Sequence, residues 1–333
     1  GLTGYKPCSL EQITKVYGSP NSSSIIAGTH THPKEQLLFY DHGANASRLS
    51  TGSITAISAT VTPISLEDLP YKNCSKPTIM NIVAHQDDDL LFMNPDLNND
   101  IRAGHCVRTI YLTAGDAGNK GKYWLGREQG SEAAYNKMIN SKELWIERIV
   151  KISENQYITI ANPRGNPNIS LVFVRLPDGN ITGGGFNAFG RESIESIEYN
   201  KKSTKTVDRQ SKYSYIDLKS TLKSLMQFYQ PTEIRTQSNF MSSIYPDHSD
   251  HMAVGRLAIA SYKDYETQVL ANRLQIPLVF YIGYPIHSKP ENVFGTELDD
   301  KYTAFLEYGR YDGAVCHTTR ECSSNPAYGS YLR

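Results

Sequence analysis

The chain has 333 residues, which is enough for one large core or for a main domain with a smaller companion. Lys and Arg total 34, and Asp and Glu total 34, so the chain lacks the excess positive charge that draws proteins onto nucleic acids or anionic lipids. Its longest apolar runs, such as 171–174 and 278–281, are far shorter than the about 20 residues that span a bilayer. We therefore expect a soluble protein with no membrane span and no nucleic-acid partner.

The first part of the chain differs in composition from the rest. Residues 1–75 are rich in Ser, Thr, Gly and Asn, and the alternating segment 53–61 is typical of a strand. The segment 78–84 is a nearly continuous apolar run of the kind that a parallel sheet buries on both faces. We therefore predict a β-rich extension over residues 1–75 and a main domain over 76–333. The sequence leaves open whether the extension packs with the main domain or folds separately.

The main domain alternates between predicted strands and helices. A second apolar run, 107–113, ends in a glycine-bearing turn at 114–118. Helical spacing of apolar residues and short β-rich runs predict the other elements. The helices are expected at 127–139, 218–229 (ended by Pro231) and 251–262, and the strands at 145–152, 157–161, 170–176, 233–236 and 276–281.

This order of elements predicts an α/β fold. We expect an open, mostly parallel, Rossmann-like sheet with helices on both faces. The three strands between 145 and 176 are separated by Asn- and Pro-rich turns, which indicates an antiparallel insertion at about 144–185. In such open sheets, ligands bind at the carboxyl ends of the strands.

Cysteines and sequons bear on the cellular compartment. The five cysteines contain no C-x-x-C pair, which argues against a cysteine zinc site, whereas Cys316 and Cys322 are placed to close a short disulfide loop. One cysteine must remain unpaired within the chain. The start at Gly1 fits either a mature secreted protein or a trimmed cytosolic one. N-glycosylation sequons of the N-x-S/T type lie at Asn21, Asn45, Asn73, Asn168 and Asn180. Because sequons and a disulfide loop favour secretion, we expect a secreted glycoprotein.

Three consecutive carboxylates follow the first buried strand, in the motif A-H-Q-D-D-D that begins at Ala84. Adjacent carboxylates repel one another unless a cation or hydrogen-bond donors neutralise them, and a metal ion is the simplest such cation. A solvated loop is the other interpretation of an Asp run. The apolar residues 90–93 that follow directly argue that this loop is not freely solvated.

A second polar motif, Y-P-D-H-S-D-H, spans 245–251 and opens a predicted helix. His248 and His251 are three residues apart, which places both imidazoles on one face of a helical turn. A histidine on its own is more often a structural residue than a metal ligand. Together, however, the two motifs supply two imidazoles and one carboxylate for a metal, with a spare imidazole and a spare carboxylate beside them. Three protein ligands and a fourth position left to water are typical of catalytic zinc.

The order of these motifs resembles the PIG-L/LmbE family of zinc-dependent de-N-acetylases. The resemblance covers roughly residues 78–285 and rests on A-H-Q-D-D-D, on T-A-G-D-A-G after the next strand, on Arg127 in the following helix, and on H-S-D-H. It differs from the family pattern A-H-P-D-D-E at Gln86 and Asp89. The resemblance implies hydrolysis of the acetamide of a GlcNAc-type N-acetylated sugar, giving acetate and a free amino sugar.

The resemblance also implies a role for each site residue. One zinc ion per chain would be held by His85, Asp88 and His251. Asp87 would be the general base, because adjacent side chains in an extended loop diverge and leave it free of the metal. His248, oriented by Asp250, would act as the acid or stabilise the oxyanion.

Two neighbouring residues are candidates for substrate binding. Arg127 matches a family arginine that faces the substrate, although a surface charge at the start of a helix is an alternative. Trp124 is placed either to stack on a pyranose ring or to pack in the core. For Asp116, in the turn after the second strand, we expect a turn-capping role.

Three other functions are compatible with parts of the pattern. A non-haem iron oxygenase also uses two His and one carboxylate, but such sites have H-x-D spacing on antiparallel barrels. A non-catalytic carbohydrate-binding protein would not need both Asp87 and His248. A zinc O-acetylesterase would use the same residues, and only the products distinguish it from an amidase. The particular sugar and the oligomeric state are not determined by the sequence.

Overall fold

The computed structural model describes residues 22–26, 35–39, 44–49, 54–59, 63–69, 74–200, 202–239, 246–269 and 275–333. Cys8 and the sequon residues Asn21 and Asn73 lie outside the described residues.

The chain divides into two compact units, 1–64 and 65–333. The first contains a four-stranded antiparallel sheet in which the strands pair in chain order. Its strands are β1 (Ser22–Ile26), β2 (Glu35–Phe39), β3 (Ala44–Leu49) and β4 (Ile54–Ala59).

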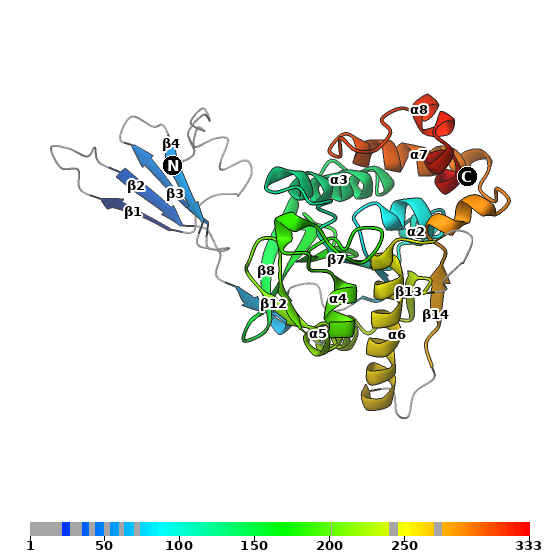
Figure 1. The fold of residues 1–333 in the computed structure, drawn as a ribbon. Coiled ribbons are helices and arrows are strands. Elements are labelled where there is room, and N and C mark those ends of the chain that lie inside the picture. Colours follow the sequence, from blue (N-terminus) through cyan, green and yellow to red (C-terminus); the bar gives the residue numbers. More distant parts are fainter. Residues whose placement is uncertain are drawn as a thin grey trace. The chain divides into compact units, whose positions relative to one another are not determined.

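An eight-stranded sheet with the order β14-β13-β6-β7-β10-β9-β8-β5 forms the centre of the second unit (Figure 1). The five strands from β14 to β10 are parallel, which confirms the predicted mostly parallel sheet. β6 and β7 are buried along their whole length, as their apolar sequences require. The strands are β5 (Ile64–Ser65), β6 (Thr78–Val83), β7 (Cys106–Thr113), β8 (Trp145–Ser153), β9 (Gln156–Pro163), β10 (Ile169–Leu176), β13 (Glu233–Gln237) and β14 (Leu278–Tyr281).

The three strands of the predicted insertion belong to this main sheet. β8 and β9 pair antiparallel, and β9 pairs antiparallel with β10. β10, however, runs parallel to β7, with Leu171 opposite Thr109. All eight residues of β10 are buried, which requires cover on both of its faces. The insertion therefore extends the central sheet and is not a separate layer. A small hairpin, β11 (Ser203–Lys205) with β12 (Lys212–Ser214), follows in the chain.

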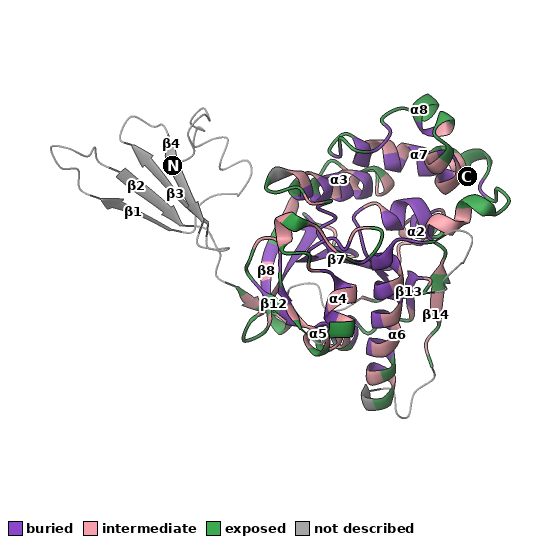
Figure 2. Ribbon diagram, viewed as in Figure 1, coloured by how far each residue is buried: buried purple, intermediate pink, exposed green. Residues whose placement is uncertain are grey.

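The helices α2 to α7 form two groups on opposite sides of the sheet (Figure 1). α2 and α7 contact α3, whereas α4, α5 and α6 contact one another. Figure 2 shows that the helix faces turned toward the sheet are buried. The helices are α2 (Asp96–Arg102), α3 (Lys122–Met138), α4 (Ile194–Asn200), α5 (Tyr215–Tyr229), α6 (Ser249–Val269), α7 (Gly295–Gly309), α8 (Thr319–Ser324) and α9 (Pro326–Leu332), with a short π-helix η2 (Asp89–Met93) and 3-10 turns η1 (Leu66–Asp68), η3 (Asn187–Phe189) and η4 (Tyr284–Ser288).

Two disulfides are present in the second unit. Cys316 and Cys322 are bonded, as predicted. Cys74 and Cys106 form the other disulfide, which ties the segment before β6 to the first residue of β7. Within the described ranges, no helix combines the length and the apolar character needed to cross a membrane.

Candidate metal centre

The predicted site residues meet at the carboxyl edge of the central sheet. His85 lies two residues beyond the end of β6, whereas His248 directly precedes α6 and His251 lies in its first turn. Because β6 is parallel to both of its neighbours, the loops that leave these strands emerge at the same edge. Two motifs that are about half the chain apart are thereby brought into contact.

The first cluster consists of His85, Asp88 and His251, the three predicted metal ligands. All three are buried, and one potential ligand atom from each lies within 4.8 Å of the others. Asp88 lies between the two imidazoles, with Oδ1 3.0 Å from His251 Nε2 and Oδ2 3.4 Å from His85 Nδ1. The backbone amide of His85 also donates to Asp88 Oδ2 at 2.6 Å, which fixes the carboxylate.

The hydrogen bonds of His251 test whether these residues suit a metal ion. Its Nδ1 lies 2.7 Å from Asp247 Oδ1, and a carboxylate partner requires the ring proton on Nδ1. The other ring nitrogen, the buried Nε2, makes no hydrogen bond of good geometry among the described residues, although it lies 3.0 Å from Asp88 Oδ1. A ring nitrogen and a carboxylate oxygen this close need a positive charge between them, which is either a proton on Nε2 or a bound metal ion that replaces this proton. The carboxylate–histidine pair is also the usual support of a metal-binding imidazole.

Charge couples these residues strongly. Burial acts to raise the pKa of Asp88, but the neighbouring His251 and His85 outweigh it and hold this pKa well below its ordinary value. Burial acts to lower the pKa of His251, but Asp88 and Asp247 outweigh it and raise this pKa to about 9. Asp88 is therefore an ionised carboxylate, which is the form that binds metal.

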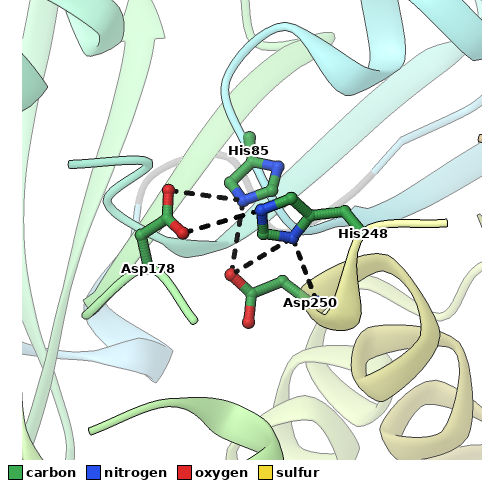
Figure 3. A group of neighbouring side chains, drawn as sticks. All are labelled: His85, Asp178, His248 and Asp250. Atoms are coloured by element: carbon green, nitrogen blue, oxygen red, sulfur yellow. Dashed lines mark hydrogen bonds and ion pairs between the residues drawn. The ribbon is translucent and has the colours of Figure 1, made fainter. Parts of the chain in front are cut away.

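A second cluster, formed by His85, Asp178, His248 and Asp250, adjoins the first (Figure 3). His85 Nε2 lies 3.3 Å from Asp250 Oδ2 and 3.8 Å from Asp178 Oδ2, and His248 Nε2 lies 3.7 Å from Asp178 Oδ1. Asp178 was not among the predicted residues. It follows β10 in the sequence P-D-G-N, which is typical of a turn and gives no sign of a site.

Asp250 contacts His248 mainly through its backbone. Its amide donates to His248 Nδ1 at 3.2 Å, whereas its carboxylate oxygen is 3.8 Å from that nitrogen. The carboxylate instead accepts from the amide of Gly179 at 2.8 Å. Burial, together with the neighbouring His85 and His251, lowers the pKa of His248. His248 is thus a neutral imidazole with its hydrogen on Nε2, the nitrogen that faces Asp178.

Asp116 has the turn-capping role that we predicted. Its Oδ2 accepts from the amide of Gly118 at 2.9 Å, within the turn after β7. Its Oδ1 accepts from the amide of Asp178 at 2.8 Å. Asp116 therefore joins the turns after β7 and β10 and helps to set the position of Asp178.

The remaining predicted residues are Asp87, Arg127 and Trp124. Asp87 accepts a hydrogen bond of 2.5 Å from Arg127 Nη2. Burial raises the pKa of Asp87, and Arg127 opposes this change. Arg127 is itself buried, and its guanidinium contacts Asp87. That Arg127 also contacts the substrate stays a prediction. Trp124 is only 8% exposed, and the guanidinium of Arg175 lies 5.0 Å from its ring centroid. Stacking of Trp124 on a sugar likewise stays a prediction.

The chain matches the model of one known protein family. The family model described as GlcNAc-PI de-N-acetylase (PIG-L) matches residues 80–262. No curated protein gave a match.

Several solved structures are similar to the chain. N,N'-diacetylchitobiose deacetylase from Pyrococcus horikoshii shares 14% identity over 80% of this chain and 80% of that chain, with a TM-score of 0.45. A triple mutant of a deacetylase of the teicoplanin biosynthetic pathway shares 12% identity over 73% and 86%, with a TM-score of 0.44. The conserved protein TT1542 from Thermus thermophilus shares 16% identity over 72% and 81%, with a TM-score of 0.41.

Proposed function

Because the chain belongs to the PIG-L (GlcNAc-PI de-N-acetylase) family, we propose that it is a zinc-dependent hydrolase that removes the acetyl group from a GlcNAc-type N-acetylated sugar. The observation that carries this proposal is the buried cluster of His85, Asp88 and His251, whose potential ligand atoms lie within 4.8 Å of one another and in which Asp88 lies between the two imidazoles. Asp87 lies beside this cluster and is bonded to Arg127. It is not one of the three ligands, which leaves it free to act as a base.

The donor set favours zinc. Two imidazoles and one carboxylate are a common ligand set for catalytic zinc, which keeps further positions for water and substrate. We propose one zinc ion per chain, held by His85, Asp88 and His251. Zinc bound there would lower the pKa of a bound water toward 7 and polarise the acetamide carbonyl.

The protein residues would move protons and stabilise charge. Asp87 accepts a proton from the attacking water, and burial, which raises the pKa of its carboxyl group, makes it a stronger base than an exposed carboxylate. His248 donates a hydrogen bond from Nε2 to the developing oxyanion, which a neutral imidazole can do. The C–N bond then breaks, and Asp87 returns its proton to the leaving amine. Water and the amide thus give acetate and a free amino sugar.

We also propose that the protein is a secreted glycoprotein. Support comes from its two disulfides, Cys74–Cys106 and Cys316–Cys322, because disulfides persist mainly in oxidising compartments. Mass spectrometry of the protein from its natural source would test this proposal, with glycan on at least one of the sequon residues, such as Asn168 or Asn180, as the expected result.

Metal analysis combined with acetate release tests the proposed function. Purified protein should contain about one zinc per chain and release acetate from N-acetylglucosamine or chito-oligosaccharides. Asp87→Ala should keep the zinc and lose the acetate. Asp208→Asn is a matched control, because Asp208 contacts Arg175 and belongs to neither cluster. Bound zinc without acetate from any N-acetyl sugar would contradict the proposal and favour an esterase or a binding protein, and protein without bound metal would refute it.

A further inference from the structure

The end of α7 and the loop after it contact Arg127, although they lie beyond residues 80–262, the part of the chain that the family model matches. α7 ends at Gly309, and Tyr308 and Asp312 lie at and just after this end. Both side chains are buried, with exposed fractions of 0% and 1%. Both point toward Arg127 of α3, which is 181 residues before Tyr308.

Protein groups hold all three nitrogens of the Arg127 guanidinium. On one side, Nε donates to Tyr308 Oη at 2.7 Å and lies 3.1 Å from Asp312 Oδ2. The Tyr308 hydroxyl in turn donates to Asp312 Oδ2 at 2.6 Å. On the other side, Nη2 donates to Asp87 Oδ1 at 2.5 Å and Nη1 to the carbonyl of Gly115 at 2.7 Å. The guanidinium is therefore a rigid bridge between the C-terminal segment and Asp87.

Small residues allow this contact between helices. A Cβ atom on Gly130 of α3 would lie 2.7 Å from Tyr308 Cδ2, and one on Gly126 would lie 2.8 Å from the carbonyl oxygen of Tyr311. These glycines are one helical turn apart and flank Arg127. Side chains at either position would push α7 away from α3 and lengthen the hydrogen bond between Tyr308 and Arg127.

Asp312 is itself held in place. Its Oδ1 accepts from the amide of Ala314 at 3.0 Å and from the hydroxyl of Tyr123 at 3.2 Å. One carboxylate oxygen is thus anchored to its own loop and to α3, which leaves Oδ2 to face Arg127 and Tyr308. A flexible or solvated acid would not hold the guanidinium in one orientation.

We propose that Tyr308 and Asp312 are positioning residues, which act through Arg127 to fix the carboxylate of Asp87 for proton transfer. The proposal rests on the proposed function, in which Asp87 is the general base. It assigns to the C-terminal segment a part in catalysis, and it makes Arg127 a support of the base. A misplacement of a reacting group by about 1 Å can cost about 100-fold in rate, so loosening the bridge should lower kcat.

Two conservative variants test the bridge. Tyr308→Phe and Asp312→Asn should each lower kcat by about 10- to 100-fold, with KM within about threefold of wild type and bound zinc unchanged. Tyr302→Phe is the matched control: it removes a hydroxyl from the same helix, but that hydroxyl contacts Ser323 and not Arg127. Its kcat should stay within about twofold of wild type.

A combined variant distinguishes positioning from a general loss of structure. If Asp312 acts through Arg127, adding Asp312→Asn to Arg127→Ala should lower kcat by less than about threefold. An unchanged kcat in both single variants, or a full additional loss in the combined variant, would overturn the proposal.

Thermal unfolding separates this proposal from the proposed function. The loss of Tm caused by Asp312→Asn should be smaller in the Arg127→Ala protein than in wild type, because the partner charge is already absent. Equal losses would overturn the bridge whatever the activity. If wild-type protein released no acetate from any N-acetyl sugar, the proposed function would fail, and the unfolding data would still decide whether Asp312 holds Arg127.

Discussion

Asp247 offers a sharp test of the metal centre, because it touches a proposed ligand without being one. Its Oδ1 accepts from three groups: His251 Nδ1 at 2.7 Å, the amide of His248 at 2.8 Å and the amide of Tyr284 at 3.0 Å. The first contact fixes the tautomer of His251 and directs Nε2 toward Asp88. We predict that Asp247→Asn and Asp247→Ala weaken zinc binding.

The expected magnitude follows from these contacts. Loss of the partner of a metal-binding histidine typically costs 10- to 100-fold in affinity, or about 1.4 to 2.8 kcal/mol. Asp247→Asn keeps an oxygen acceptor and removes the charge, so its zinc Kd should rise about 10-fold. Asp247→Ala also removes the acceptor of the buried amide of His248 and of the partly buried amide of Tyr284, and a buried amide left without an acceptor costs about 1–3 kcal/mol. It should therefore reach the 100-fold end and lower Tm as well.

Competition with a chromophoric chelator measures these affinities directly. His251→Ala should abolish tight zinc binding. Asp208→Asn should bind zinc like wild type, because Asp208 contacts Arg175 and none of the proposed ligands. A zinc Kd within about twofold of wild type for both Asp247 variants, beside a His251→Ala protein that binds no zinc, would refute the role assigned to Asp247.

Three further predictions concern other buried groups. Gly179→Ala should lower activity at least about 10-fold, because the new Cβ would lie 2.4 Å from Asp250 Oδ1; activity equal to wild type in an acetate-release assay would contradict this close contact. Burial lowers the pKa of Lys301 from 10.5 to about 7, so the unfolded chain binds this proton more tightly and stability should rise as pH increases through this range. In urea titrations at several pH values, Lys301→Met should reduce the rise of the free energy of unfolding with pH. An unchanged rise would contradict the role given to Lys301. Arg175 pairs with Glu128 through two hydrogen bonds of 2.8 Å, and Arg175→Met should lower the free energy of unfolding by about 3 kcal/mol because it leaves a buried carboxylate unpaired; a loss under about 1 kcal/mol in denaturant unfolding would show that the pair contributes little.

Local patterns were sufficient to predict much of the central fold. The apolar runs at 78–84 and 107–113 became β6 and β7, because a strand that is buried on both faces needs apolar residues throughout. The helix ending before Pro231 begins at Tyr215, behind a capping box formed by Ser214 and Asp217. The C-terminal helices α7, α8 and α9 were not predicted.

The sequence by itself placed the proposed ligands His85, Asp88 and His251 in two short motifs, since residues close in sequence at a strand end or a helix start must also be close in space. Only the tertiary structure decided what surrounds them. Asp178 reaches His248 because β10 runs parallel to β7, Trp124 packs on Arg175, and the C-terminal segment reaches Arg127 across α3. Such contacts depend on strand order and helix packing, and residue spacing along one chain does not record them.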